Sequence, residues 1–167
     1  GSLTGLAVLI AIIFDAVSDP IMGSISDRFI SKLGRRHPFM FFAPFPTVLA
    51  ICLMFFPPEG LSDYALFAWL IGTTIVLRIS ITLFAVPHLA LGAELSEDYI
   101  ERSRVMSYNN LLGYMGVIIM HIFAWFLVFP NFAGEEIGQL NQAAYTPIVI
   151  FSTILIALCI LLSAYFT

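Results

Sequence analysis

The sequence predicts an all-α protein, a polytopic bundle of about five helices that each cross a membrane. Of its 167 residues, 60% are apolar and only 11% are charged, whereas about a quarter of the residues of a soluble domain are charged. Apolar stretches long enough to cross a hydrocarbon core of about 30 Å, which takes about 20 helical residues, recur along the chain. They are too long for the alternating strands of an outer-membrane barrel. The composition therefore indicates an integral membrane protein, with the lipid bilayer as its surroundings.

Each predicted span ends where proline, glycine or charged residues interrupt the apolar pattern. The first ends at the charged segment that begins with Asp27, the second at Pro57 and Pro58, the third before the acidic segment 94–98, and the fourth at Pro130. The spans cover residues 3–26, 38–57, 64–90, 104–129 and 145–167, and we expect residues 1–167 to form one transmembrane domain.

The beginning of the chain indicates a partial sequence. It opens on Gly-Ser rather than Met, so we expect a piece of a longer protein, unless the dipeptide was added to the natural sequence. The first span is not a secretory signal, because it is long, carries aspartates and has no basic residue before it.

The loop charges predict the orientation. Four of the seven basic residues lie between the first two spans, and Arg102 and Arg104 lie between the third and the fourth. Because positive loops stay in the cytoplasm, loops 27–37 and 91–103 are predicted to face the cytoplasm, at the cell's inner (plasma) membrane. The net charge is −4, and the charged residues are divided among the loops by sign. They form no basic patch of the kind that binds nucleic acid, which argues against a nucleic-acid partner.

Two aspartates lie inside the first span, in the stretch FDAVSDPIMG. Asp15 and Asp19 are four positions apart, so they share one helix face with about 6 Å between their Cβ atoms. A charge at membrane depth costs at least ~2.5 kcal/mol, so the pair should face a hydrated, protein-lined interior. Two such carboxylates are suited to hold a proton or a small hard cation such as Na⁺.

Arg78 is the one basic residue inside a span. The first and third spans both run inward from the outer side, and Arg78 is predicted to lie at the depth of Asp15. If the two helices pack together, Arg78 neutralises Asp15, and Asp19, Ser18 and Thr82 leave an oxygen-rich pocket one turn further in. The alternative is an ion pair that only fixes helix packing.

Other residues inside the spans have less specific interpretations. Pro87 should kink the third span and is a candidate hinge, or else a static kink. Asn110 and Tyr114 share a face of the fourth span and either bond solute hydroxyls in a cavity or join helices. His121 is better explained by a hydrogen bond between helices than by a proton relay. No nucleophile–base pair, phosphate-binding loop or metal-ligand spacing is visible, so we expect no enzyme, cofactor or metal beyond a possible Na⁺.

The loop GSISDRFISKLGRRHPF resembles the cytoplasmic signature of the major facilitator superfamily. The resemblance implies a salt-bridged latch that opens and closes with alternating access. The alternative is a basic loop that only sets topology. The residues that carry the motif are Gly23, Asp27, Arg28, Gly34, Arg35 and Arg36.

Two further stretches, DAVSDPIMG and VPHLALGAELSEDYIERSRV, resemble the glycoside–pentoside–hexuronide:cation symporters of that superfamily. The resemblance implies helices 2 to 6 of a twelve-helix transporter, within its N-terminal half, with the first helix and the C-terminal half as missing partners. It also implies a coupling-cation site at Asp15, Ser18, Asp19 and Thr82.

The sugar site departs from the family pattern. Ala85, Leu89 and Asn110 stand where melibiose-transporting members have a carboxylate, a tryptophan and an arginine. Arg78 stands where those members have a small residue. It either favours proton coupling or binds the carboxylate of a sugar acid.

The expected function is symport of a sugar, glycoside or sugar acid, coupled to H⁺ or Na⁺ by alternating access. A structural or receptor-like membrane protein that kept the fold is the alternative, and a membrane-embedded enzyme is a weaker third.

Overall fold

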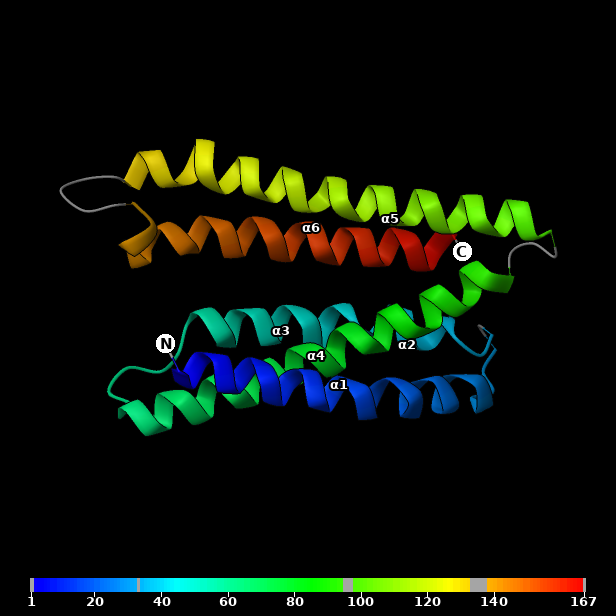
Figure 1. Cartoon of the computed structure of the whole chain (residues 1–167), viewed down its shortest axis with the longest axis horizontal. Helices are drawn as coiled ribbons and strands as arrows, with labels where there is room; N and C mark the ends of the chain where they lie inside the picture. Colours follow the sequence, from blue (N-terminus) through cyan, green and yellow to red (C-terminus); the bar gives the residue numbers. More distant parts are fainter. Residues whose placement is uncertain (1, 33, 95–97, 133–137, 167) are drawn as a thin grey trace. The chain divides into compact units, whose positions relative to one another are not determined.

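Helices make up most of the part of the chain that the structure describes, and that part contains no β-strand. The computed structural model describes residues 2–32, 34–94, 98–132 and 138–166. Figure 1 shows the α-helices that these residues form. They are α1 (Ser2–Arg28), α2 (His37–Phe42), α3 (Pro44–Phe55), α4 (Asp63–Glu94), α5 (Tyr99–Ile122) and α6 (Tyr145–Phe166). Between α5 and α6 lie a π-helical segment, η1 (Phe123–Val128), and three 3₁₀ turns, η2 (Phe129–Phe132), η3 (Gly138–Leu140) and η4 (Gln142–Ala144).

Among the described residues, five helical segments are long and apolar enough to cross a membrane, which confirms the predicted fold class. They are Gly5–Arg28, His37–Phe55, Asp63–Glu94, Tyr99–Val128 and Gln142–Phe166. The fourth begins earlier than its apolar residues indicate, because Asp98 caps it: the carboxylate accepts a hydrogen bond of 2.7 Å from the backbone N–H of Ile100. An N-terminal cap extends a helix into polar sequence that a hydropathy pattern does not count.

The second span, predicted as one helix, is one helical segment from His37 to Phe55 with an interruption inside it. The break between α2 and α3 falls at Ala43, just before Pro44. Proline has no N–H, so Pro44 cannot donate to the carbonyl four residues earlier. Ala43 still donates to the carbonyl of Phe39, and Thr47 donates to the carbonyl of Ala43, at 2.9 and 3.2 Å. The two helices therefore continue one another across the proline.

The chain forms two compact units, and each is described here by itself. Unit 1 comprises residues 1–91 and 156–167. Within it the Trp69 indole of α4 donates a 2.8 Å hydrogen bond to the carbonyl of Leu53 in α3. Phe29 packs edge-to-face on Phe39, with ring centroids 5.0 Å apart. Unit 1 holds the charged residues that lie inside the first and third spans.

Unit 2 comprises residues 92–155. Phe123 at the end of α5 stacks on Phe151 of α6, with ring centroids 4.2 Å apart. The Tyr145 hydroxyl donates a 2.8 Å hydrogen bond to the carbonyl of Gln139. Gly138 lies against the backbone of Phe129 so closely that a Cβ there would collide with it. These contacts pack the described parts of the α5–α6 connection against one another and against the two helices.

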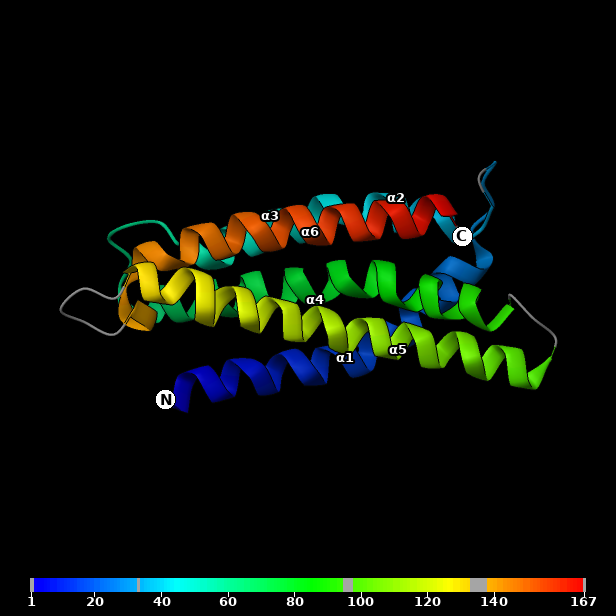
Figure 2. The ribbon, with the colours of Figure 1, turned by 90° about the horizontal axis from the view of Figure 1, so that it is seen from above.

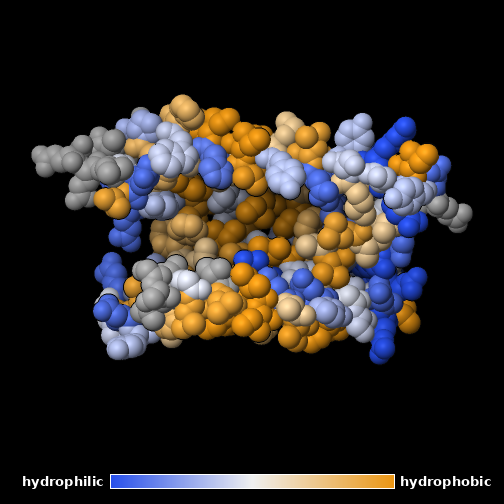
Figure 3. Space-filling model, viewed as in Figure 1, coloured by the Kyte–Doolittle hydropathy of each residue, from blue (hydrophilic) through white to orange (hydrophobic). Residues whose placement is uncertain are grey.

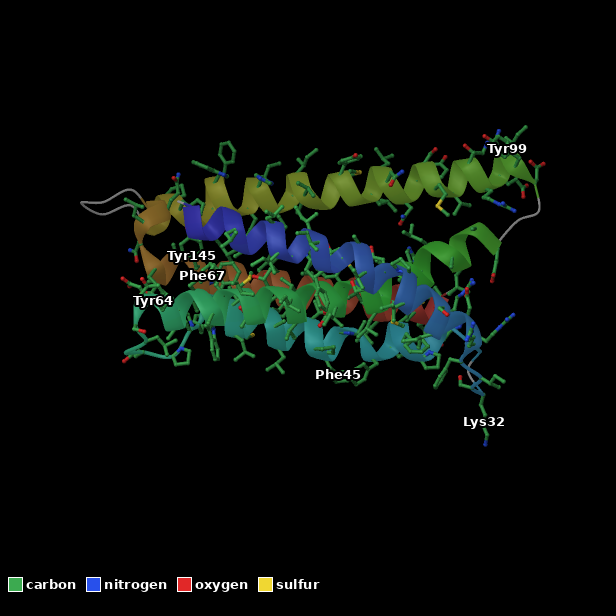
Figure 4. The ribbon with its side chains drawn as sticks, turned by 60° about the horizontal axis from the view of Figure 1, so that its bottom comes forward. Lys32, Phe45, Tyr64, Phe67, Tyr99 and Tyr145 are labelled. Atoms are coloured by element: carbon green, nitrogen blue, oxygen red, sulfur yellow. The ribbon has the colours of Figure 1, made fainter. Side chains whose placement is uncertain are left out.

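The helix sides are mostly hydrophobic, and hydrophilic residues gather at the helix ends (Figure 3). Phe45 lies on the outer side of α3 and Tyr64 at the beginning of α4 (Figure 4), with exposed fractions of 71% and 84%. Lys32 extends away from the loop that follows α1 (Figure 4). Large apolar side chains exposed along whole helices are what a bilayer covers, in agreement with a multi-pass membrane protein.

Candidate cation and solute site

Helices α1 and α4 run in the same direction and meet along three successive turns (Figures 1 and 2). Asp15 meets Arg78 and Asp19 meets Thr82, each pair 63 positions apart in the sequence. One turn further, Gly23 lies beside Val86, where a Cβ on the glycine would be 3.7 Å from the valine Cγ1. Since each pair follows the previous one by four residues on both helices, the two helices are in register over this region.

Asp15 and Arg78 form an ion pair. The Arg78 Nη1 donates to Asp15 Oδ2 at 2.9 Å, and the exposed fractions of the two side chains are 42% for Arg78 and 24% for Asp15. The other carboxylate oxygen, Oδ1, is buried and accepts no hydrogen bond from any described residue. The carboxylate is therefore held by the guanidinium through one of its two oxygens.

Asp19 is held by a hydroxyl rather than by a charge. The Oγ1 of Thr82, which is only 7% exposed, donates a 2.8 Å hydrogen bond to Asp19 Oδ1. Ser18 contributes to neither carboxylate, because its hydroxyl lies 3.4 Å from the backbone carbonyl of Asp15. The structure thus places four of the five predicted residues in two direct pairs and directs the fifth side chain to the backbone.

The pocket beside these pairs is apolar rather than oxygen-rich as expected. Its volume is about 270 Å³, and Ser18 and Thr82 are its polar residues. Neither aspartate is among the described residues that line it. Arg78 and Thr82 instead bond directly to the two carboxylates. The remaining lining residues are Phe14, Val17, Ile21, Met22, Ile25 and Ile79.

The first loop contains a second ion pair. Both Nε and Nη2 of Arg36 donate to Asp27 Oδ1, at 3.2 and 2.7 Å, so the end of α1 is tied to the beginning of α2. Gly34 has a φ of +95°, which favours glycine, and its carbonyl accepts a 2.6 Å bond from the Ser31 hydroxyl. Of the other motif residues, Gly23 faces Val86, and Arg28 and Arg35 are exposed.

Three residues of the third span lie in the second half of α4. Pro87 is buried, and α4 continues beyond it to Glu94. His88 stacks on Phe84, with ring centroids 4.9 Å apart, and its Nδ1 lies 3.1 Å from the Ser163 Oγ of α6. No feature of the sequence predicts this link, because hydropathy does not reveal how α6 is rotated about its axis.

The predicted residues of the fourth span lie on exposed sides of α5. Asn110 is exposed, and Tyr114 is 72% exposed. Both belong to unit 2, so their part in a solute cavity stays a prediction. Among the described residues, His121 contacts its own helix rather than another as expected: its Nδ1 lies 2.8 Å from the carbonyl of Val117, one turn earlier. In the part of the chain that is described, no three His, Cys, Asp or Glu side chains gather as metal ligands.

The chain resembles known membrane symporters over nearly its whole length. Residues 2–167 match the family model described as MFS/sugar transport protein. The inner membrane symporter YicJ of Escherichia coli (strain K12) is 26% identical over 156 residues, which are 93% of this chain and 33% of that protein. The putative glycoside/cation symporter YagG of the same strain is 28% identical, over 80% of this chain and 29% of that protein.

A mammalian relative also matches. The sodium-dependent lysophosphatidylcholine symporter 1 of Mus musculus is 28% identical, over 64% of this chain and 21% of that protein. The chain spans from 19% to 33% of the length of the curated relatives that it matches. No solved structure matches the chain significantly.

Proposed function

This chain belongs to the MFS/sugar transport protein family, and on that premise we propose that it is part of a secondary transporter in which a cation, H⁺ or Na⁺, drives a sugar-like solute across the membrane. The family is one of transporters, not of enzymes. The remainder of the transporter, a preceding helix and a second half, completes the solute pathway, and residues 1–167 contribute one transmembrane domain to it.

The paired carboxylates of α1 carry the proposal. Asp15 and Asp19 lie inside an apolar span, where charged groups are costly and usually functional. Each contacts α4 directly, one through Arg78 at 2.9 Å and the other through Thr82 at 2.8 Å. A cation that binds or leaves Asp19 alters the contact with α4, so ion binding is linked to the packing of two helices. Ser18 completes the proposed cation site.

The solute is a sugar, glycoside or sugar acid. The description of the family, MFS/sugar transport protein, supports this class, as does the similarity to a putative glycoside/cation symporter. Asn110 and Tyr114 offer an amide and a hydroxyl, which are the groups that bond sugar hydroxyls. They lie one turn apart on α5 and line the solute cavity in this proposal.

Alternating access uses the first loop and α4. The Asp27–Arg36 pair fastens the cytoplasmic end of α1 while that side is closed, and Arg28 and Arg35 provide further positive charge beside it. Gly23 allows α1 to slide close to α4, and Pro87 is the hinge at the inner end of α4. Loops 27–37 and 91–103 face the cytoplasm at the inner membrane, as their basic residues indicate.

Transport by the full-length protein in proteoliposomes tests the proposal. Radiolabelled methyl β-D-glucoside, methyl β-D-xyloside and glucuronate are supplied with an inward gradient of H⁺ or of Na⁺. We expect concentrative uptake of at least one solute in the wild type and its loss in Asp19→Asn. Asp63→Asn is the matched control, since Asp63 is exposed at the beginning of α4. Uptake independent of either ion, or normal coupling in Asp19→Asn, would contradict the proposal.

The same experiment addresses the structural or receptor-like alternative. Such a protein moves none of the solutes in any variant, and Asp19→Asn then changes only the resistance to unfolding. Counterflow, in which unlabelled solute inside exchanges with labelled solute outside, separates transport from coupling. A transporter that has lost coupling still shows counterflow.

A further inference from the structure

We propose that Arg78 sets the ion specificity of this site. Its guanidinium occupies the place beside Asp15 that Na⁺ would otherwise take, so that the coupling ion is a proton carried by Asp19. This inference rests on the proposed function and narrows it to one ion.

The first argument is occupancy at Asp15. Arg78 Nη1 lies 2.9 Å from Asp15 Oδ2, the distance of a strong charge-assisted hydrogen bond. A guanidinium stays protonated at every physiological pH, so it cannot give up its charge to make room for a metal ion. A Na⁺ held between the two carboxylates would share Asp15 with a permanent positive charge.

The second argument is the charge inside unit 1. Between their ends, α1, α3, α4 and the 156–166 part of α6 carry two aspartates, Arg78, one histidine and Cys52 and Cys159 as titratable side chains. Asp27, Tyr64 and Tyr165 lie one residue from a helix end. His88 lies further along α4, with its Nδ1 3.1 Å from Ser163 Oγ. The cluster of Asp15, Asp19 and Arg78 therefore carries one net negative charge, which a single proton neutralises.

The third argument is the number of oxygen ligands. A hard metal cation needs several oxygens around it, whereas a proton needs only one. The Thr82 hydroxyl donates its hydrogen to Asp19, and the Ser18 hydroxyl is directed at a backbone carbonyl. The pocket beside them is otherwise lined by apolar side chains. Asp19 can therefore bind a proton, whereas the residues around it do not supply the several oxygens that a metal ion needs.

The proton step is simple. A proton from water forms an O–H bond with Asp19 Oδ2, while Oδ1 keeps the hydrogen bond from Thr82. The carboxylate becomes a neutral acid, and the cluster becomes neutral. When the site opens to the cytoplasm, that O–H bond breaks and the proton returns to water. Asp15 and Arg78 remain charged and paired throughout.

Sodium binding to the purified full-length transporter tests the inference without knowledge of the solute. NaCl is titrated calorimetrically against choline chloride for wild type, Arg78→Gln and Arg78→Lys. We expect no saturable Na⁺ binding in wild type or in Arg78→Lys. In Arg78→Gln the repulsion of a charge about 6 Å away is removed, so we expect the affinity for Na⁺ to rise by roughly a hundredfold and binding to become saturable. Lys32→Gln, a cation of the first loop, is the control and should behave as wild type.

Two outcomes would overturn the inference. The first is saturable Na⁺ binding in wild type, which is decisive even if Arg78→Gln does not fold. The second is a folded Arg78→Gln that binds no Na⁺. Proteoliposomes loaded with a pH-sensitive dye separate the inference from the proposed function: Na⁺-driven solute uptake by wild type overturns the inference and leaves symport intact. Solute uptake without any ion removes both, whereas proton entry with solute supports both.

Discussion

Removal of the Asp15–Arg78 pair should reveal a large coupling energy between α1 and α4. The perturbation is a double-mutant cycle of Asp15→Asn, Arg78→Gln and the double variant. At a charge separation of about 4 Å and an effective dielectric constant of about 20, the attraction is about 4 kcal/mol. The partial exposure of both side chains, 42% and 24%, screens this attraction, and we expect a coupling of about 2 kcal/mol.

Unfolding of the full-length protein in mixed micelles, with increasing fractions of sodium dodecyl sulfate, measures this coupling. Each single variant should lose about 2 to 3 kcal/mol, because it leaves one charge without its partner at membrane depth. The double variant should lose less than the sum of the two. Additive losses within about 0.5 kcal/mol would refute the reasoning, since independent sites behave in that way.

Two further predictions concern Thr82 and Gly34. Thr82→Val removes the hydroxyl that donates to Asp19 at 2.8 Å and should weaken coupled uptake by roughly tenfold, as expected for a hydrogen bond to a charged group, whereas Thr82→Ser should retain it. Equal uptake by Thr82→Val and wild type would exclude a role for the hydroxyl. Gly34→Ala should cost about 1 to 2 kcal/mol in the same unfolding assay, because its φ of +95° is unfavourable for a side chain. Unchanged stability would mean that the loop adopts another backbone conformation.

The agreement between sequence and structure is best where charge and topology act together. The positive loops imply that the first and third spans run in the same direction, and a charge inside a membrane needs a partner at its own depth. These two conditions select Arg78 as the partner of Asp15 and place Thr82 near Asp19. The structure contains both contacts, at 2.9 and 2.8 Å.

The predictions and the structure differ where a contact depends on how a helix is rotated about its axis or on where the helix is interrupted. His121 is exposed, and its Nδ1 lies 2.8 Å from the carbonyl of Val117 in its own helix. The link between His88 and Ser163 depends on the rotation of α6, which an apolar sequence leaves unspecified. The π-helical segment from Phe123 to Val128 has no composition of its own that separates it from an α-helix.

A structural role and a functional role for the Arg78 pair are compatible, and the double variant separates them. Arg78→Gln leaves two carboxylates that repel each other, so it should be both unstable and able to bind Na⁺. Asp15→Asn with Arg78→Gln restores the wild-type net charge and leaves Asp19 as the only carboxylate of the cluster. We expect this double variant to recover stability while binding protons and not Na⁺. A pair that served only to hold α1 and α4 together would give the same recovery of stability, with an ion preference that none of these variants alters.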